Sequence, residues 1–104
     1  MAENTKQYAN FEEFYPFYLS QHSNIINRRL HIIGTILACM ILLLSYLFHT
    51  NKYLLLVPLA GYGFAWIGHF CVEKNRPATF KHPLYSLMGD FRMVYDSLTG
   101  KLKI

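Results

Sequence analysis

The chain has 104 residues, of which 53% are hydrophobic and only 15% are charged, whereas an average soluble domain carries about 25% charged residues. This length allows one domain, residues 1–104, and leaves no room for a second folding unit. The net charge of +4 does not indicate a nucleic-acid partner, because the basic residues flank apolar stretches, where lipid headgroups are the expected contact.

The first predicted element is a helix over residues 10–22 that lies at a membrane interface. Asn10 and Glu13 have the spacing of a helix start, in which each side chain pairs with a free backbone amide. Aromatic side chains next to an apolar stretch are typical of an interfacial helix. They recur at the spacing of one helical face, at Phe11, Tyr15, Tyr18 and His22.

Two apolar stretches follow, at residues 30–48 and 53–72, and each is close to the roughly 20 residues that a membrane-spanning helix needs. The first contains no acidic or basic residue except His31, and the second none except His69. Because the link between them is short, the two helices are predicted to run antiparallel as a membrane hairpin. Lys52 is the one lysine or arginine of that link, so the positive-inside rule places both termini in the cytoplasm.

The last predicted element is an amphipathic helix over residues 83–98, with Pro83 in its first turn. Its apolar stripe consists of Leu84, Leu87, Met88, Phe91, Val94, Tyr95 and Leu98. Asp90, Arg92 and Asp96 make the segment too polar for a lone span, so we expect it to lie at the interface or to pack on the hairpin. The predicted fold class is therefore all-α, an integral membrane helical hairpin or bundle with flanking helices at both ends.

The predicted hairpin gathers the histidines at one end of the molecule. In an antiparallel pair whose link centres near residue 50, residues whose numbers sum to about 100 lie at the same depth. His31 and His69 meet this condition, and His22 and His82 lie just outside the spans at the same end. Small residues spaced by four let membrane helices approach closely, which would aim His31 and His69 at each other. These small residues are Gly34 and Ala38 on the first stretch and Gly61 and Ala65 on the second.

A cluster of imidazoles at this depth suggests a metal site, because neutral imidazole is a common ligand for zinc and iron. Glu73 lies four residues after His69 and is a candidate ligand, or a hydrogen-bond acceptor that orients an imidazole. Asn27, one turn before His31, is a candidate for the same orienting role. The alternatives are a surface carboxylate for Glu73, a capping or solvated amide for Asn27, and isolated interfacial side chains for the histidines.

Two parts of the sequence resemble a known family. The first is YLSQH at residues 18–22, continuing to NRRLHIIGT at residues 27–35. The second is WIGHF at residues 66–70, followed by EKNRPATF and KHPLYSL through residue 87. Together they resemble the 2-hydroxy fatty acid (2-hydroxy-palmitic acid) dioxygenase-like family, formerly a domain of unknown function, over about residues 10–98. The chain is similar to a short, bacterial-type member.

The resemblance implies an Fe(II)-dependent dioxygenase that carries out α-oxidation. With O2, it would convert a long-chain 2-hydroxy fatty acid into CO2 and a fatty acid one carbon shorter. The family's histidine positions, with their catalytic metal-ligand role, correspond to His22, His31, His69 and His82. Arg76 or Lys81 is a candidate for binding the substrate carboxylate, with contact to lipid headgroups as the alternative. The expected location is the bacterial inner membrane, or the endoplasmic reticulum if the chain is eukaryotic.

Two other functions stay open at this point. One is a zinc-dependent membrane hydrolase of a lipid amide, which would hold zinc tightly and turn over without oxygen. The other is a non-enzymatic membrane scaffold protein, in which loss of His31 and His69 would change neither metal content nor lipid profile. The sequence also leaves open the substrate chain length and whether the chain forms an oligomer.

Overall fold

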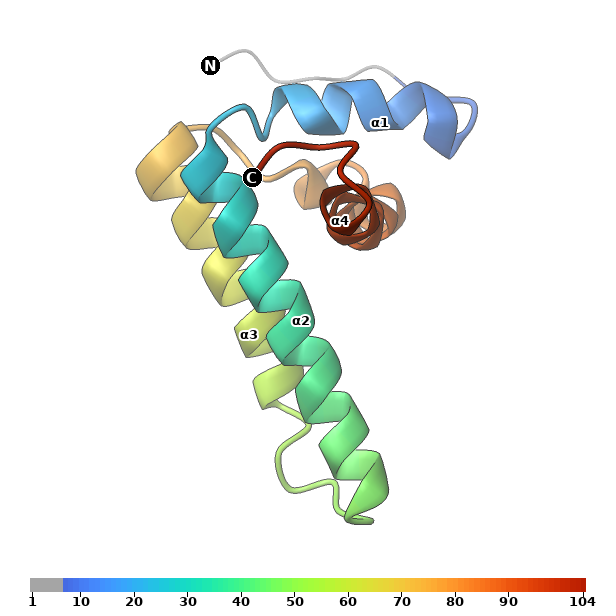
Figure 1. Ribbon diagram of the computed structural model, residues 1–104, viewed down its shortest axis with the longest axis vertical. Coiled ribbons are helices and arrows are strands. Elements are labelled where there is room, and N and C mark those ends of the chain that lie inside the picture. The colour runs from blue at the N-terminus through green and yellow to red at the C-terminus, as the bar shows by residue number, and fades with distance from the viewer. Residues whose placement is uncertain (1–6) are drawn as a thin grey trace.

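The computed structural model describes residues 7–104, which are all-helical and contain no strand (Figure 1). The elements are α1 (Phe11–Ser20), α2 (Ile25–Leu47), α3 (Leu56–Ile67), the π-helix η1 (Gly68–Glu73), the 3-10 helix η2 (Ala78–Phe80) and α4 (Pro83–Leu98). The all-α prediction is therefore confirmed.

Helix α1 starts where the sequence predicts. The side chain of Asn10 accepts a hydrogen bond from the backbone amide of Glu13 at 2.9 Å, and the Glu13 carboxylate accepts one from the amide of Ala9 at 3.1 Å. The first bond satisfies an amide that the first turn of a helix leaves free, and the second ties the residue before the cap to the same turn. Pro16 lies inside the helix without ending it. Figure 1 shows α1 lying across the end of the long α2–α3 pair.

Helices α2 and α3 pack side by side and antiparallel (Figure 1). The predicted small-residue contact between Ala38 and Gly61 is present, since a β-carbon on Gly61 would lie 4.0 Å from that of Ala38. Gly34 packs on Ala60, five residues before the expected Ala65. A β-carbon on Gly34 would lie 2.9 Å from the Ala60 carbonyl oxygen, so this crossing requires glycine.

The described residues contain one helix long and apolar enough to cross a membrane, rather than the two that we expected. This helix is α2, with a mean hydropathy of 2.3 over its 18-residue window. The second apolar stretch is divided instead. Residues 52–55 form turns, and α3 begins only at Leu56, where Pro58 suits the first helical turn. At Gly68 the chain then passes from α-helix into η1.

Helix α4 turns its apolar stripe away from the rest of the protein. Leu84, Phe91 and Leu98 are 67%, 50% and 80% exposed. The buried face instead carries Ser86, Gly89, Met93 and Asp96. Most of the stripe therefore faces outward, although α4 also contacts α2 of the hairpin, where Phe91 and Val94 line a cavity between the two helices.

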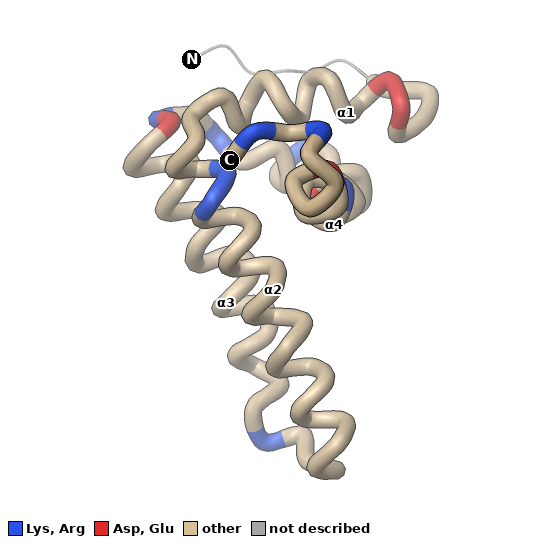
Figure 2. Tube along the Cα trace, viewed as in Figure 1, with Lys and Arg blue, Asp and Glu red and all other residues tan. Residues whose placement is uncertain are grey.

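The core lies between α1 and α4, at the same end of the molecule as the histidines. It contains the buried side chains Phe14, Tyr15, Tyr18, Ala78 and Met93. Two buried or partly buried tyrosine–aspartate hydrogen bonds join the helices, Tyr15 to Asp96 at 2.9 Å and Tyr18 to Asp90 at 2.5 Å. The charged residues also concentrate at this end, while the shafts of α2 and α3 below it are uncharged (Figure 2).

Candidate metal centre

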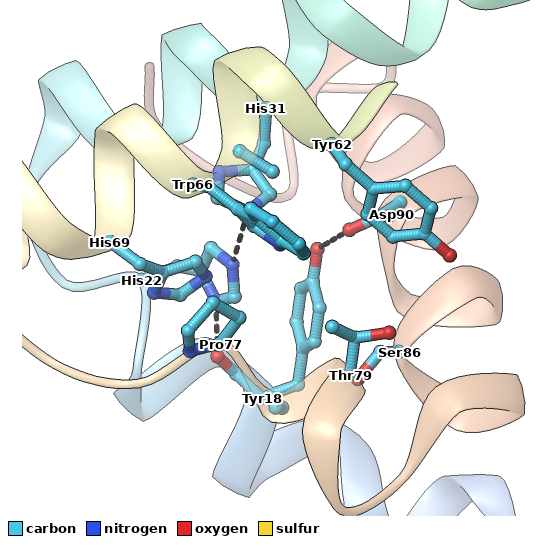
Figure 3. A pocket seen from close by; sticks show the side chains of 12 residues that line it. Tyr18, His22, His31, Tyr62, Trp66, His69, Pro77, Thr79, Ser86 and Asp90 are labelled. Atoms are coloured by element: carbon cyan, nitrogen blue, oxygen red, sulfur yellow. Dashed lines mark hydrogen bonds between the residues drawn. The ribbon is translucent and has the colours of Figure 1, made fainter. Parts of the chain in front are cut away.

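Three histidines from three different elements meet in the interior, just below α1. His22 follows the end of α1, His31 lies in the second turn of α2, and His69 lies in η1. Their ring centroids are 4.3 Å (His22–His31), 4.5 Å (His22–His69) and 4.8 Å (His31–His69) apart. All three are at least 96% buried. The predicted approach of His31 and His69 is confirmed, and Figure 3 shows His22 beside them.

Local backbone structure turns each ring inward. Asn24 caps α2 through a 2.8 Å bond from the Ile26 amide, which sets where His31 falls on the helix. The wider turn of η1 carries His69, and π-helical turns of this kind occur frequently at functional sites. Lys74 then adopts a left-handed conformation with φ of 59°, and the Asn75 amide bonds back to the His69 carbonyl at 3.0 Å.

Each ring uses its Nδ1 atom in a hydrogen bond to an oxygen. His22 Nδ1 donates to the Tyr18 carbonyl at 2.6 Å, and His31 Nδ1 donates to the Asn27 carbonyl at 3.0 Å. His69 Nδ1 donates to Asn75 Oδ1 at 2.6 Å. Carbonyl oxygens only accept hydrogen bonds, so Nδ1 must carry the proton in each ring. The Nε2 atom of each neutral ring is then a bare lone pair, which is the form that binds a metal.

The contact between His22 and His31 fits a shared cation. Their Nε2 atoms lie 3.0 Å apart, yet neither has a proton to donate, so two lone pairs face each other. Metal–nitrogen bonds of about 2.0–2.1 Å set at a right angle would place two ligand atoms about 3 Å apart. The candidate ligand atoms of all three histidines lie within 4.8 Å of one another. The residues present therefore fit a metal ion.

A proton shared between the two rings is the less favourable way to fill this contact. Burial lowers the pKa of His22 well below its ordinary value, and the neighbouring imidazoles lower it further. A protonated ring would be a buried charge, and no carboxylate belongs to the histidine cluster in the described part of the chain. A metal ion would also be a buried charge, but coordinate bonds to three neutral nitrogens would offset the cost of burying it.

The histidines open on a small cavity of about 20 Å³, which is room for a molecule the size of water. Tyr18 forms one wall, with its ring stacked on His22 at 4.1 Å between centroids. Asp90 lies beyond the Tyr18 hydroxyl, and Tyr62 and Trp66 lie beside it (Figure 3). Burial raises the pKa of Asp90 to about 6, against a smaller lowering by the Tyr18 hydrogen bond.

His82, the fourth predicted ligand, lies outside the cluster of three. Its ring centroid is 5.2 Å from that of Tyr8 and 5.3 Å from that of Phe14, in the aromatic layer under α1. Its Nε2 atom is buried and has no hydrogen-bond partner among residues 7–104. The role of His82 as a ligand remains a prediction.

Glu73 and Asn27, predicted as ligands or orienting groups, act on the backbone around the cluster. Glu73 accepts hydrogen bonds from the Asn24 amide, the Ser23 hydroxyl at 3.2 Å and the Asn27 side chain at 3.4 Å. It therefore ties η1 to the start of α2. Asn27 contacts the His31 ring through its backbone carbonyl, which any residue at this position could do, so an orienting role for its side chain remains a prediction.

The two candidates for the substrate carboxylate lie on the surface. Arg76 and Lys81 are exposed, and neither lines the histidine cavity. The Arg76 guanidinium lies 5.9 Å from the centre of the Phe80 ring. Their predicted role in binding substrate remains a prediction.

Residues 8–102 match the protein family described as "2-hydroxy-palmitic acid dioxygenase Mpo1-like". The chain belongs to this family. The match covers nearly the whole chain, so it includes all three elements that supply the histidines. The resemblance found in the sequence is thus confirmed, and the family name suggests an enzyme that acts on a 2-hydroxy fatty acid. Neither the curated proteins nor the solved structures that were compared include a match.

Three contributors to this Mpo1-like site were not predicted from the sequence. Asn75 orients His69, while Tyr18 and Asp90 line the cavity. Asn75 lies within the second family-like stretch, directly after Glu73 and Lys74, so the motif contained a signal for it. Asp90 has only the weak signal of an acidic residue within an amphipathic helix.

Proposed function

We propose that the protein is an Fe(II)-dependent dioxygenase that carries out α-oxidation of 2-hydroxy fatty acids. The observation that carries this proposal is the convergence of three neutral imidazole nitrogens in a chain of the Mpo1-like family. The balanced reaction takes a 2-hydroxy acid and O2 to a fatty acid one carbon shorter, CO2 and water. The C1–C2 bond breaks, and the C2 carbon becomes the new carboxyl.

His22, His31 and His69 would hold the iron, leaving positions for substrate and oxygen as three-histidine sites can. When bound, Fe(II) supplies the activation of dioxygen. The protein's own contribution is to hold the rings still. The backbone carbonyls of Tyr18 and Asn27 and the side-chain oxygen of Asn75 each accept the Nδ1 proton of one histidine. This keeps the proton on Nδ1, so that the three Nε2 atoms stay unprotonated and point towards one another. Hydrogen bonds of this kind to metal-bound histidines raise their basicity and fix their orientation.

The site lies where a membrane-embedded lipid can reach it. We infer that α2 and α3 enter the bilayer, because the apolar window of α2 is only 17% buried within the protein and exposed apolar surface of this extent needs a partner. The outward stripe of α4, including Leu84 and Leu98, would lie on the lipid at the interface. The basic residues at that end favour a cytoplasmic location for both termini.

An apolar cavity between α2 and α4 offers space for the acyl chain. It measures about 230 Å³ and is lined by Thr35, Ile36, Cys39, Met40, Leu43, Phe91 and Val94. Thr35 lies one helical turn after His31, and Phe91 follows Asp90, so this cavity lies on the same two helices as His31 and Asp90, although the two cavities share no lining residue. We propose that a substrate whose carboxylate lies at the histidines places its hydrocarbon tail in this cavity.

The direct test is incubation of the purified protein with Fe(II), O2 and 2-hydroxypalmitate. The expected products are pentadecanoate and CO2, with one O2 consumed for each acid cleaved. Binding of metal without either product would contradict the proposal. Tightly held zinc with oxygen-independent turnover would point to a hydrolase instead.

A further inference from the structure

Two tyrosine–aspartate pairs join α1 to α4, and only one of them lines the histidine cavity. Tyr15 bonds to Asp96 and Tyr18 bonds to Asp90, so the two pairs have the same chemistry on the same two helices. Tyr18 and Asp90 belong to the cavity wall together with His22, His31 and His69, whereas Tyr15 and Asp96 do not. The second pair is therefore an internal control for the first.

The two carboxylates also differ in how their oxygens are used. Asp96 accepts the Tyr15 hydroxyl on Oδ2 and the Arg92 guanidinium on Oδ1 at 3.1 Å, so both oxygens have donors. Asp90 accepts the Tyr18 hydroxyl on Oδ1, and within the described part of the chain its Oδ2 has no hydrogen-bond donor. Asp90 is partly buried and lines the cavity, so its second oxygen is an acceptor that a bound molecule could use.

Tyr18 fixes the separation between this acceptor and the histidines. Its ring stacks on His22, and its hydroxyl reaches Asp90. Gly89 lets α4 lie directly against the ring, since a β-carbon there would be 2.7 Å from Tyr18 Cδ2. Figure 3 shows the phenol lying between the imidazoles and Asp90. One aromatic ring thus separates the candidate metal ligands from the carboxylate.

A 2-hydroxy acid differs from an ordinary fatty acid by one hydroxyl next to the carboxylate. A hydroxyl donates one hydrogen bond, and an ionised carboxylate only accepts. We propose that Asp90 accepts the hydrogen bond of the substrate's 2-hydroxyl, which makes it the residue that selects 2-hydroxy acids over unsubstituted fatty acids. This inference rests on the proposed function. Tyr18 is a positioning residue, because it acts by holding Asp90 and His22 in place.

Such a contact favours the 2-hydroxy acid, because an analogue that lacks the hydroxyl cannot donate this hydrogen bond to Asp90. We expect the native protein to bind 2-hydroxypalmitate at least about tenfold more tightly than palmitate. A fixed acceptor on one wall also distinguishes the two mirror-image forms of the 2-hydroxy acid. We therefore expect one enantiomer of 2-hydroxypalmitate to bind more tightly than the other.

The test measures binding without turnover, at pH 8 and in the absence of oxygen, on the metal-loaded protein in detergent. Trp66 is the chain's single tryptophan and lines the cavity, so its fluorescence can report occupancy. Asp90→Asn should reduce the preference for 2-hydroxypalmitate over palmitate to less than about threefold. The matched variant Asp96→Asn removes the equivalent carboxylate outside the cavity and should keep the native preference.

The outcomes separate this inference from the proposed function. An unchanged preference in Asp90→Asn would overturn the role of Asp90 and leave the proposed substrate class in place. A native protein with no preference between the two acids would overturn both. If Asp90→Asn does not fold, the affinities of the native protein for the two enantiomers of 2-hydroxypalmitate provide the test. Equal affinities would exclude a fixed acceptor for the hydroxyl.

Discussion

The hydrogen bond from His69 to Asn75 is expected to strengthen metal binding at the candidate site, and substitutions of Asn75 and Gln21 test this to different degrees. Asn75 Oδ1 accepts the His69 Nδ1 proton at 2.6 Å, while its Nδ2 donates to the carbonyl and side-chain oxygens of Gln21 at 3.1 and 3.2 Å. These two donations fix which end of the amide faces the histidine. Asn75→Ala removes the acceptor but leaves the backbone bond from residue 75 to the His69 carbonyl.

Loss of such a partner typically lowers metal affinity by 10- to 100-fold, or about 1.4–2.8 kcal/mol. We expect this loss for Asn75→Ala. Gln21→Ala removes only one of the two acceptors that hold the amide, so its effect should stay below about threefold. The assay is competition for Fe(II) with a coloured chelator under anaerobic conditions. Equal affinities for the native protein and Asn75→Ala would refute the claim that this hydrogen bond prepares His69 to bind a metal.

Three other predictions concern pH, packing and chain length. The folded-state pKa of Asp90, raised from 3.8 to about 6, costs stability as pH rises through that range. The unfolding free energy of Asp90→Asn relative to the native protein should therefore increase by about 2.5 kcal/mol between pH 4 and pH 8, and denaturant titrations showing a constant difference would contradict this. Gly89→Ala should destabilise the protein by about 1–3 kcal/mol through overpacking, whereas Gly63→Ala, with open space around it, should not, as thermal unfolding can measure. Leu43→Trp should shift turnover towards shorter 2-hydroxy acids by filling the far end of the acyl cavity, while Leu37→Trp, outside that cavity, should leave the chain-length profile unchanged.

The meeting of His31 and His69 could be predicted because counting residues from the link sets their depth. Small residues then set which faces of α2 and α3 touch, although the contact of Gly34 is shifted from Ala65 to Ala60. Counting works here because His31 lies on α2, and His69 is only the second residue of η1, which continues directly from α3. The same reasoning placed His82 only approximately, since residues 74–82 follow an irregular path that has no period to count.

The orientation of α4 and the role of Asn75 depend on contacts that no periodic pattern encodes. The apolar stripe of α4 is strong in sequence, yet the helix buries the opposite face because Gly89 packs on Tyr18 and two aspartates bind tyrosine hydroxyls. Asn75 reaches His69 because Lys74 adopts a left-handed conformation after the π-helix. Single backbone features of this kind are decided by tertiary packing.

Metal content of the purified protein tests most directly whether the three histidines hold one ion. We predict one metal ion per chain in the native protein and in His49→Ala, since His49 lies at the opposite end of α2. His22→Ala, His31→Ala and His69→Ala should each lose nearly all of it while keeping their helical content. Native metal content in all three variants, or a native protein that takes up no metal, would contradict the account.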